Sequence, residues 1–301
     1  MSGSSGVLVI AGPTASGKTE LAIDLARRFD AEIVNADSRQ MYRGMPVGTA
    51  APAPEQFAAA PHHLFGFLDP AERYSAARYS ADAVAAIAQI HARGKRAIVV
   101  GGTGFYVRAL TGAVDLAPQY DEAVRERLVR ESRAHGAEFL HAWLNVRDHQ
   151  RAEAIHPKDS YRVLRALEVA LAPHSGSREE RISSLRSAGI PFLKLFLTIE
   201  ENALRERIAR RADAMLQAGF VEEAERIGED AVAATAVGYP QAFAYARGWS
   251  TPGELRELLI RATRRYAKRQ TTWFRSEPET VQALPADVER LARESLHWVE
   301  A

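Results

Sequence analysis

The chain has 301 residues, of which 47% are hydrophobic and 26% are charged, and this composition excludes wholesale disorder. It contains no cysteine, which excludes a disulfide scaffold, a thiolate zinc site, an iron–sulfur cluster and a cysteine nucleophile. Its 39 Lys and Arg residues nearly balance 38 Asp and Glu residues, and the net charge of +1, taken alone, argues against a nucleic-acid partner.

Strand and helix signals alternate through the first hundred residues or so. Short apolar runs with β-branched residues predict strands at Val7–Ala11, Glu32–Ala36 and Arg96–Val100. Apolar residues at helical spacing predict helices at Thr19–Phe29 and Ser75–Arg93. Strands that alternate with helices of this length indicate βαβ units, and therefore a parallel sheet flanked by helices.

The pattern changes after this region. From about residue 114 to 190 the sequence predicts Arg-rich helices, at Asp121–His135 and Ser160–Leu171, and no convincing strand. A strand signal returns at Phe192–Ile199, and helices follow at Glu200–Ala218, Val221–Glu229 and Pro252–Phe274. We predict an α/β core made of residues 1–113 and 191–301, interrupted by a helical insertion at 114–190.

No export or membrane signal is visible in the sequence. The segment Met1–Gly6 has neither the charged leader nor the apolar core of a signal peptide. The longest apolar runs, Val7–Ala11 and Ala97–Val100, are far too short to span a membrane. We therefore expect a soluble, cytoplasmic protein.

A phosphate-binding loop follows the first strand. The match to G-x-x-x-x-G-K-[ST] consists of Gly12, Pro13, Thr14, Ala15, Ser16, Gly17, Lys18 and Thr19. Glycines let the backbone wrap closely around an anion, and successive N–H groups at the start of a helix then face the phosphates. Lys18 would add a positive charge and the Thr19 hydroxyl could bind Mg²⁺. The pattern predicts a diphosphate or triphosphate ligand without identifying what the phosphates carry.

Two further loops end strands at the same predicted sheet edge, where ligands bind in open α/β sheets. Asp37 follows the second strand, and either binds Mg²⁺, acts as a base, or simply forms a turn with Ser38. The third strand ends in Gly101–Gly104, where Thr103 could offer a hydroxyl to a substrate, or form a plain strand-to-helix turn.

In their order and spacing, the segments GPTASGKT, DSRQMYRGMPVGTA, PHHLFGFLDP and IVVGGTGFYVRAL resemble the tRNA dimethylallyltransferase (isopentenyltransferase) family. The resemblance covers nearly the whole chain and continues at His156–Asp159, Arg162–Val169, Ile208–Gly219, Ala236–Tyr239 and Arg264–Trp273. It implies transfer of a dimethylallyl group from dimethylallyl diphosphate to N6 of the adenosine immediately 3′ of the anticodon in tRNA. It also implies a P-loop NTPase-like core, a helical insertion that contacts the anticodon stem-loop, a Mg²⁺ cofactor, and a monomer.

The resemblance implies a role for each matching residue. Asp37 is the implied general base, Thr103 hydrogen-bonds where the amine meets the bridging oxygen, and Lys18 and Arg211 bind the diphosphate with the loop from Gly12 to Thr19. Thr19 would hold the metal. The implied tRNA-reading residues are Asp37, Ser38, Arg39, Gln40, Tyr161, Arg162, Val163, Leu164 and Arg165. From the sequence alone, Arg211 could equally be one more surface arginine beside Arg205, Arg207 and Arg210.

The chain departs from the family pattern at several positions. Thr235 and Pro240 stand where the family usually has arginines on either side of Ala-Val-Gly-Tyr. The insertion reads HPKDSYR where the family commonly has HPNDPQR. These changes leave the implied diphosphate and base positions intact and affect the choice of tRNA.

The distribution of charge differs from its sum. Residues 261–275 contain six basic side chains and no acidic one, and most of them lie off an apolar stripe made by Leu255, Leu258, Leu259, Ala262 and Tyr266. This basic face is either a solvated helix surface or a contact for tRNA phosphates, and beside a tRNA site we favour the second.

Three other functions remain open on the sequence. A P-loop kinase of a nucleoside or small metabolite would explain the phosphate-binding loop equally well. An adenylate isopentenyltransferase acting on free AMP or ADP would need no helical insertion. A tRNA-binding protein without activity would need no base at Asp37.

Overall fold

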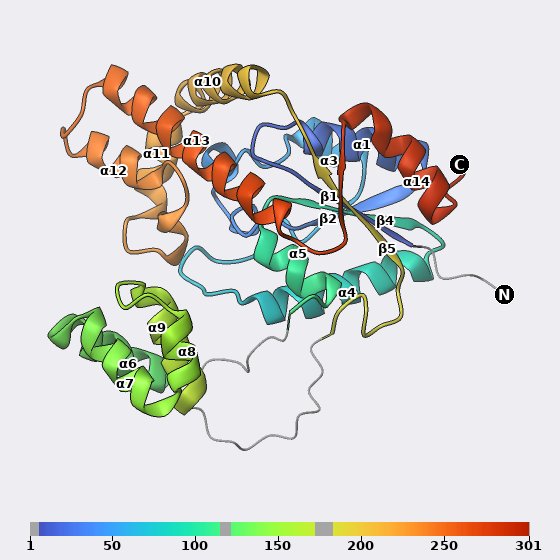
Figure 1. Cartoon of the computed structure of the whole chain (residues 1–301). Helices are drawn as coiled ribbons and strands as arrows, with labels where there is room; N and C mark the ends of the chain where they lie inside the picture. Colours follow the sequence, from blue (N-terminus) through green and yellow to red (C-terminus); the bar gives the residue numbers. More distant parts are fainter. Residues whose placement is uncertain (1–5, 115–121, 172–182, 301) are drawn as a thin grey trace. The chain divides into compact units, whose positions relative to one another are not determined.

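The computed structural model describes residues 6–114, 122–171 and 183–300. Within them, six parallel strands form one sheet in the order β3-β2-β4-β1-β5-β6 (Figure 1). The strands are β1 (Val7–Ala11), β2 (Ala31–Asn35), β3 (His62–His63), β4 (Arg96–Gly101), β5 (Phe192–Leu197) and β6 (Thr280–Ala283). The predicted parallel α/β sheet is confirmed.

The helices of the core, four of which lie between β5 and β6, connect these strands. They are α1 (Lys18–Arg28), α2 (Pro46–Thr49), α3 (Pro54–Ala59), α4 (Ala76–Ala92), α5 (Gly104–Thr111), α10 (Glu201–Gln217), α11 (Phe220–Ile227), α12 (Tyr239–Ala246), α13 (Pro252–Arg275) and α14 (Val288–Leu296). Short 3-10 helices lie at Val232–Thr235 and Pro285–Asp287. None of the helices described here has the length and apolarity needed to cross a membrane.

The central strands are buried on both faces, which explains why they are continuous apolar runs and not alternating patterns. Every residue of β1 and β2 is buried. Helices α1 and α14 cover one face of the sheet, and α4 and α5 cover the other (Figure 1). Because all strands run parallel, their carboxyl ends meet at one edge, with Ala11 of β1 paired to Gly101 of β4.

The two outer strands were not predicted from the sequence. β3 has only two residues, both histidines, and β6 exposes its two central residues, so neither forms an apolar run. Helices α2, α3, α5, α12 and α14 were also not predicted, nor were the helices at Ala137–Arg147 and His149–Ala154. The other predicted elements agree to within two residues at each end, apart from Asp121, which lies outside the described residues.

The chain divides into two compact units, Met1–Val114 with Ile182–Ala301, and Asp115–Arg181. The predicted insertion, 114–190, therefore overlaps the first unit at residues 183–190. Residues 183–190 belong to the core because the Ser80 hydroxyl donates to the Ser183 carbonyl (2.6 Å) and the Leu185 amide donates to the Leu110 carbonyl (2.8 Å).

The second unit is helical, as predicted. It contains α6 (Glu122–His135), α7 (Ala137–Arg147), α8 (His149–Ala154) and α9 (Ser160–Leu171). These helices share an apolar cluster that includes Leu128, Leu140, Leu144, Val163 and Leu167. Beside it, the buried carboxylate of Glu168 is neutralised by Arg125 (2.6 Å) and Arg165 (3.0 Å).

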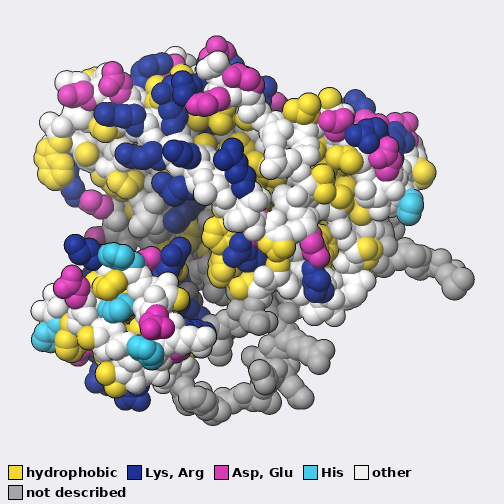
Figure 2. Space-filling view, in the orientation of Figure 1, with side chains coloured by type: hydrophobic (Ala, Val, Ile, Leu, Met, Phe, Trp, Pro, Cys, Tyr) yellow, Lys and Arg dark blue, Asp and Glu magenta, His cyan; other side chains and the backbone are white. Residues whose placement is uncertain are grey.

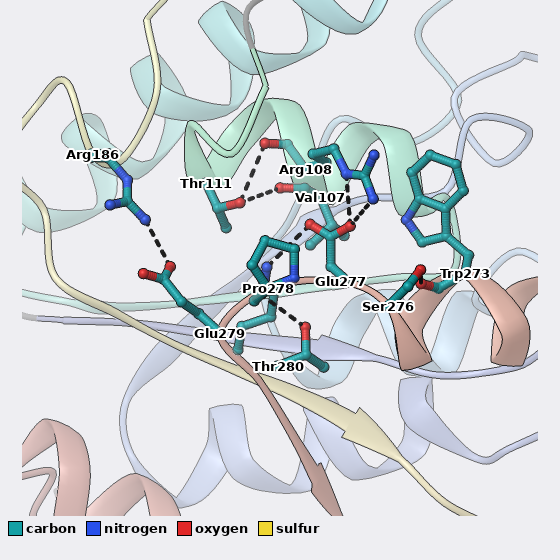
Figure 3. A network of polar contacts seen from close by, with 11 residues as sticks. Val107, Arg108, Thr111, Arg186, Trp273, Ser276, Glu277, Pro278, Glu279 and Thr280 are labelled. Carbon is teal, nitrogen blue, oxygen red and sulfur yellow. Dashed lines mark hydrogen bonds and ion pairs between the residues drawn. The ribbon is translucent and has the colours of Figure 1, made fainter. Parts of the chain in front are cut away.

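A buried charge network joins β5, α5 and the end of α13 in the core. The Glu277 carboxylate accepts from Arg108 (2.6 Å) and from the fully buried Lys194 (3.3 Å), as Figure 3 shows for the first pair. The Arg108 guanidinium also lies 4.2 Å from the centre of the Trp273 ring. Burial lowers the pKa of Lys194, and the charge of Glu277 opposes that shift.

Removing the carboxylate from this network should destabilise the core more than removing the lysine. Glu277→Gln removes the counter-charge that is hydrogen-bonded to the buried ammonium of Lys194, and we expect it to lower the free energy of unfolding by about 3–5 kcal/mol. Lys194→Met leaves Glu277 paired with Arg108, and should cost about 1 kcal/mol or less. Urea denaturation of both variants measures the difference, and equal losses would contradict this account.

Candidate active site at the carboxyl edge of the sheet

The phosphate-binding loop connects β1 to α1. Gly17 has a φ of 86° and Ala15 a φ of 65°, so two residues of the loop take the left-handed conformation. That conformation is strained for alanine, and such strain is found where a loop must curl around a ligand. Among the described residues, no side chain caps the first turn of α1, so its N–H groups remain available to an anion.

Lys18, Asp37 and Arg211 act on one another electrostatically, which brings together three residues that lie far apart in the sequence. Burial lowers the pKa of Lys18 to about 8, the negative charge of Asp37 raises it, and the positive charge of Arg211 lowers it. Burial also lowers the pKa of Arg211, and Asp37 again opposes the shift. The site therefore holds two cations and one carboxylate beside the phosphate-binding loop.

Asp37 is held by a neighbour that the sequence analysis did not select. The fully buried Asn35 accepts from the Asp37 amide (2.8 Å) and donates to the carbonyls of Asp37 (3.0 Å) and Leu64 (2.9 Å). The Oδ1 atom of Asp37 accepts from the Arg39 amide (2.9 Å). Its Oδ2 atom has no hydrogen-bond partner within 6–114, 122–171 and 183–300, and so can accept a proton from a substrate.

Thr103 lies directly beside the Asp37 loop. Its hydroxyl accepts from the Ser38 amide (2.9 Å), and its amide donates to the Ala36 carbonyl (3.2 Å). A side chain at Gly101 would come within 2.1 Å of the Ala36 backbone, so only glycine permits this approach of the two strand ends. The structure thus brings together the predicted pair Asp37 and Thr103.

Helix α10 turns two arginines toward the site and two away from it. Arg211 donates to the Thr49 carbonyl (3.1 Å), and Arg207, one turn earlier, donates to the Ser16 carbonyl of the phosphate-binding loop (3.3 Å). The other two arginines, Arg205 and Arg210, pair on the surface with glutamates of their own helix. Arg211 is therefore not an ordinary surface arginine, and Arg207 is a site residue that the sequence analysis missed.

The helix α2, which contains the Thr49 carbonyl bound by Arg211, is itself held in place by the buried carboxylate of Glu223. Glu223 of α11 is fully buried and accepts from the amides of Val47 (2.8 Å) and Gly48 (2.7 Å), and from the Tyr239 hydroxyl (2.7 Å). These bonds fix the first turn of α2, whose last residue is Thr49.

Gln40 and Arg39, predicted to read tRNA, have different partners. Gln40 donates to the carbonyls of Thr49 (3.1 Å) and Ala50 (2.9 Å), so its amide supports α2. Arg39 donates to the Thr235 hydroxyl (3.1 Å). The threonine that replaces a family arginine thus holds an arginine that comes from another loop.

This geometry agrees with comparisons to known proteins. A family model described as IPP transferase matches residues 40–277, and one described as isopentenyl transferase matches residues 5–63. The chain belongs to the IPP transferase family. A tRNA dimethylallyltransferase of Geobacter sulfurreducens is 44% identical over 282 residues, which cover 90% of this chain and 89% of that protein. Another, from Thioalkalivibrio sulfidiphilus, is 44% identical over 98% of this chain and 96% of that protein.

Solved structures of the family share the fold. The tRNA isopentenylpyrophosphate transferase of Bacillus halodurans is 34% identical, with a TM-score of 0.68 over 96% of this chain and 95% of that one. A eukaryotic dimethylallyltransferase acting on tRNA is 25% identical, with a TM-score of 0.74 over 97% of this chain and 76% of that one. The P-loop NTPase-like fold expected from the sequence is therefore confirmed.

The five predicted tRNA-reading residues of the insertion lie at the start of α9. The side chains of Val163 and Leu164 are buried in the apolar cluster of their own unit, and Arg165 is paired with Glu168. Tyr161 is 65% exposed, and the side chain of Arg162 is 70% exposed. Side-chain contacts with RNA from this segment are thus open chiefly to Tyr161 and Arg162.

Proposed function

We propose that this chain transfers a dimethylallyl group from dimethylallyl diphosphate to N6 of the adenosine immediately 3′ of the anticodon in tRNA, releasing diphosphate. The observation that carries the proposal is the placement of Asp37 and Thr103 beside Lys18 and the phosphate-binding loop. A kinase could use the same loop and a carboxylate, but it would leave the Thr103 loop and the helical insertion without a role. The family membership supports the same reaction.

The reaction needs a base for the amine and an anion site for the leaving diphosphate. An exocyclic amine is a poor nucleophile because its lone pair is delocalised into the ring. As N6 forms a bond to C1 of the allyl group, the C1–oxygen bond breaks, its electron pair leaves with the diphosphate, and Asp37 takes the N6 proton. The loop amides, Lys18 and Arg211 stabilise the charge on the leaving group.

The donor set fits a Mg²⁺ ion that binds together with the diphosphate. The part of the chain that the structure describes contains no cluster of three or more His, Cys, Asp or Glu side chains that could hold a metal by itself. Mg²⁺ commonly binds through one or two protein oxygens and substrate phosphates, and the Thr19 hydroxyl at the start of α1 is such a ligand. The ion would supply positive charge to the leaving diphosphate.

The direct test is to incubate the protein with Mg²⁺, dimethylallyl diphosphate and a tRNA that carries an adenosine next to the anticodon. Mass spectrometry of the digested nucleosides should show N6-dimethylallyladenosine. Parallel incubations with ATP, and with AMP as the acceptor, test the kinase and the adenylate isopentenyltransferase. Phosphate transfer from ATP, or modification of AMP but not tRNA, would overturn the proposal.

An exposed basic face on α13 supports tRNA as the partner. The side chains of Arg261, Arg264, Arg265, Lys268, Arg269 and Arg275 are all exposed, and none forms an ion pair with a described carboxylate. Figure 2 shows a row of Lys and Arg side chains along the path of this helix. Some exposed arginines elsewhere, such as Arg205 of α10 and Arg290 of α14, are paired with acids. We propose that these unpaired cations bind the RNA backbone.

Binding of tRNA should then depend strongly on salt. Arg265→Ala is expected to weaken binding at low salt and to reduce the slope of log K against log[salt] by about 1, because one phosphate contact is lost. Arg290→Ala is the matched control, since Arg290 is equally a helix-surface arginine but already pairs with Glu294 (2.9 Å). Equal slopes for the two variants would contradict a role for the α13 face.

A further inference from the structure

One face of α13 packs closely against the loop that follows β4. Tyr266, Gln270 and Trp273 are spaced by four and three positions, so their side chains lie on the same side of the helix. A side chain at Gly104 would come within 2.2 Å of the Trp273 ring, and one at Gly102 within 2.1 Å of the Gln270 amide nitrogen. Burial and the charge of Asp37 raise the pKa of the Tyr266 hydroxyl, and a hydrogen bond with Thr103 opposes this rise. Helix and loop therefore fit only because the loop carries glycines.

Gln270 is the member of this face that joins the two halves of the site. Its Oε1 atom accepts from the Thr14 amide of the phosphate-binding loop (2.8 Å), and its Nε2 atom donates to the Gly102 carbonyl next to Thr103 (2.9 Å). The residue is only 5% exposed. Without it, a backbone donor and a backbone acceptor would both be buried unpaired.

The helix that carries Gln270 is rigidly attached close by. Three residues further on, Trp273 packs against Arg108 of α5, and Arg108 is bound to the buried Glu277 (Figure 3). Helix α5 begins at Gly104, directly after Thr103. The helix that carries Gln270 and the loop that carries Thr103 are therefore both attached to α5.

We propose that Gln270 is a positioning residue, which sets the spacing between the diphosphate cradle and the Asp37–Thr103 edge where the amine must lie. The inference rests on the proposed function. An amide suits this role because it accepts on one side and donates on the other, and each bond fixes one loop. Small errors in the alignment of two reactants reduce the rate strongly, even where each reactant still binds.

Gln270→Glu tests this role with little change of shape. The new carboxylate can still accept from Thr14 but cannot donate to Gly102, and instead places an oxygen against the Gly102 carbonyl. We expect kcat to fall by about 10- to 100-fold, whereas the dissociation constant of dimethylallyl diphosphate, measured by calorimetry, rises by a smaller factor, which reflects repulsion by the new charge. Gln89→Glu, on the exposed face of α4, is the matched control and should retain the wild-type kcat.

The pH dependence separates positioning from general damage. Burial raises the pKa of a carboxyl group, and its protonated form can both accept and donate, as the amide does. The ratio of the kcat of Gln270→Glu to that of the wild type should therefore rise as pH falls from about 8 to about 6. Gln270→Leu, which has neither group, should show no such recovery.

Each outcome bears on one claim. If the wild-type chain itself transfers no dimethylallyl group, the proposed function fails. If the wild type is active and the kcat of Gln270→Glu lies within about threefold of it, the positioning role is overturned. The role is also overturned if only donor affinity falls, because Gln270 would then merely build the phosphate-binding loop.

Discussion

Asp37→Asn is expected to lower kcat by about 10²- to 10⁴-fold, because an amide cannot take the proton that N6 must lose. The substitution conserves the shape of the side chain. Its Oδ1 atom can still accept from the Arg39 amide, the contact that orients Asp37 in the wild-type chain. Single-turnover measurements with bound tRNA and dimethylallyl diphosphate would report the chemical step directly.

The structure offers a close control for this substitution. Asp69 makes the same kind of local bond, since its Oδ1 atom accepts from the Ala71 amide two residues later (2.9 Å), but it is exposed and is not among the site residues. Asp69→Asn should leave kcat unchanged, whereas donor binding should survive in both variants. Wild-type turnover in Asp37→Asn would show that another group takes the proton.

The parts of the site that could be predicted from the sequence are those encoded by contiguous residues. The phosphate-binding loop is one such motif, and the apolar runs that precede Asp37 and Gly101–Gly104 predict parallel strands, which place both at the same sheet edge. A parallel sheet brings its carboxyl ends together whatever the connecting helices do. Asp37, Thr103 and Lys18 could therefore be assembled before any coordinates were known.

The residues that support this site could not be predicted in the same way. Gln270 continues the helical spacing of the apolar stripe after Tyr266, but its partner Thr14 lies 256 positions away, so the sequence does not show what the amide binds. Arg207 and Arg205 have the same residue type on the same helix, and only the packing of α10 decides which one faces the phosphate-binding loop. The resemblance to a family identified Arg211 but gave no reason for Asn35, because hydrogen bonds to a turn leave no periodic signal.

The net charge wrongly argues against a nucleic-acid partner, because it sums over residues that have different partners. Many surface cations of this chain are paired with nearby acids, and the acids cancel them in the total. The cations of α13 are not paired in this way within the described part of the chain, so the field they produce is local and extends along one helix. A chain of net charge +1 can therefore present a strongly basic surface to RNA.

Lys18→Met should reduce kcat/KM for dimethylallyl diphosphate by about 10²- to 10³-fold, because the positive charge beside the phosphate-binding loop is lost. The wild-type enzyme should show a related pH dependence. Since the pKa of Lys18 is about 8, kcat/KM for the donor should decline above pH 8, approaching tenfold per pH unit. Steady-state kinetics from pH 6 to 10 measure both effects, and a flat profile above pH 8 would show that Lys18 stays charged in the free enzyme.

The same substitution should make the protein more stable. The pKa of Lys18 falls from 10.5 in the unfolded chain to about 8 in the folded one, so the folded state binds this proton more weakly. Below pH 8 that difference costs stability, up to about 3 kcal/mol, less in proportion to the solvent that still reaches the side chain. The cost disappears as pH rises from 8 to 10.5, because the folded chain no longer carries the proton.

Lys18→Met should therefore exceed the wild type in free energy of unfolding at pH 7, and the advantage should shrink toward pH 10. Lys268→Met, at an exposed position of α13, should not raise the free energy of unfolding at pH 7 and should not change its pH dependence. A gain in stability together with a loss of donor turnover would show that this lysine is held in the loop for catalysis at the expense of the fold.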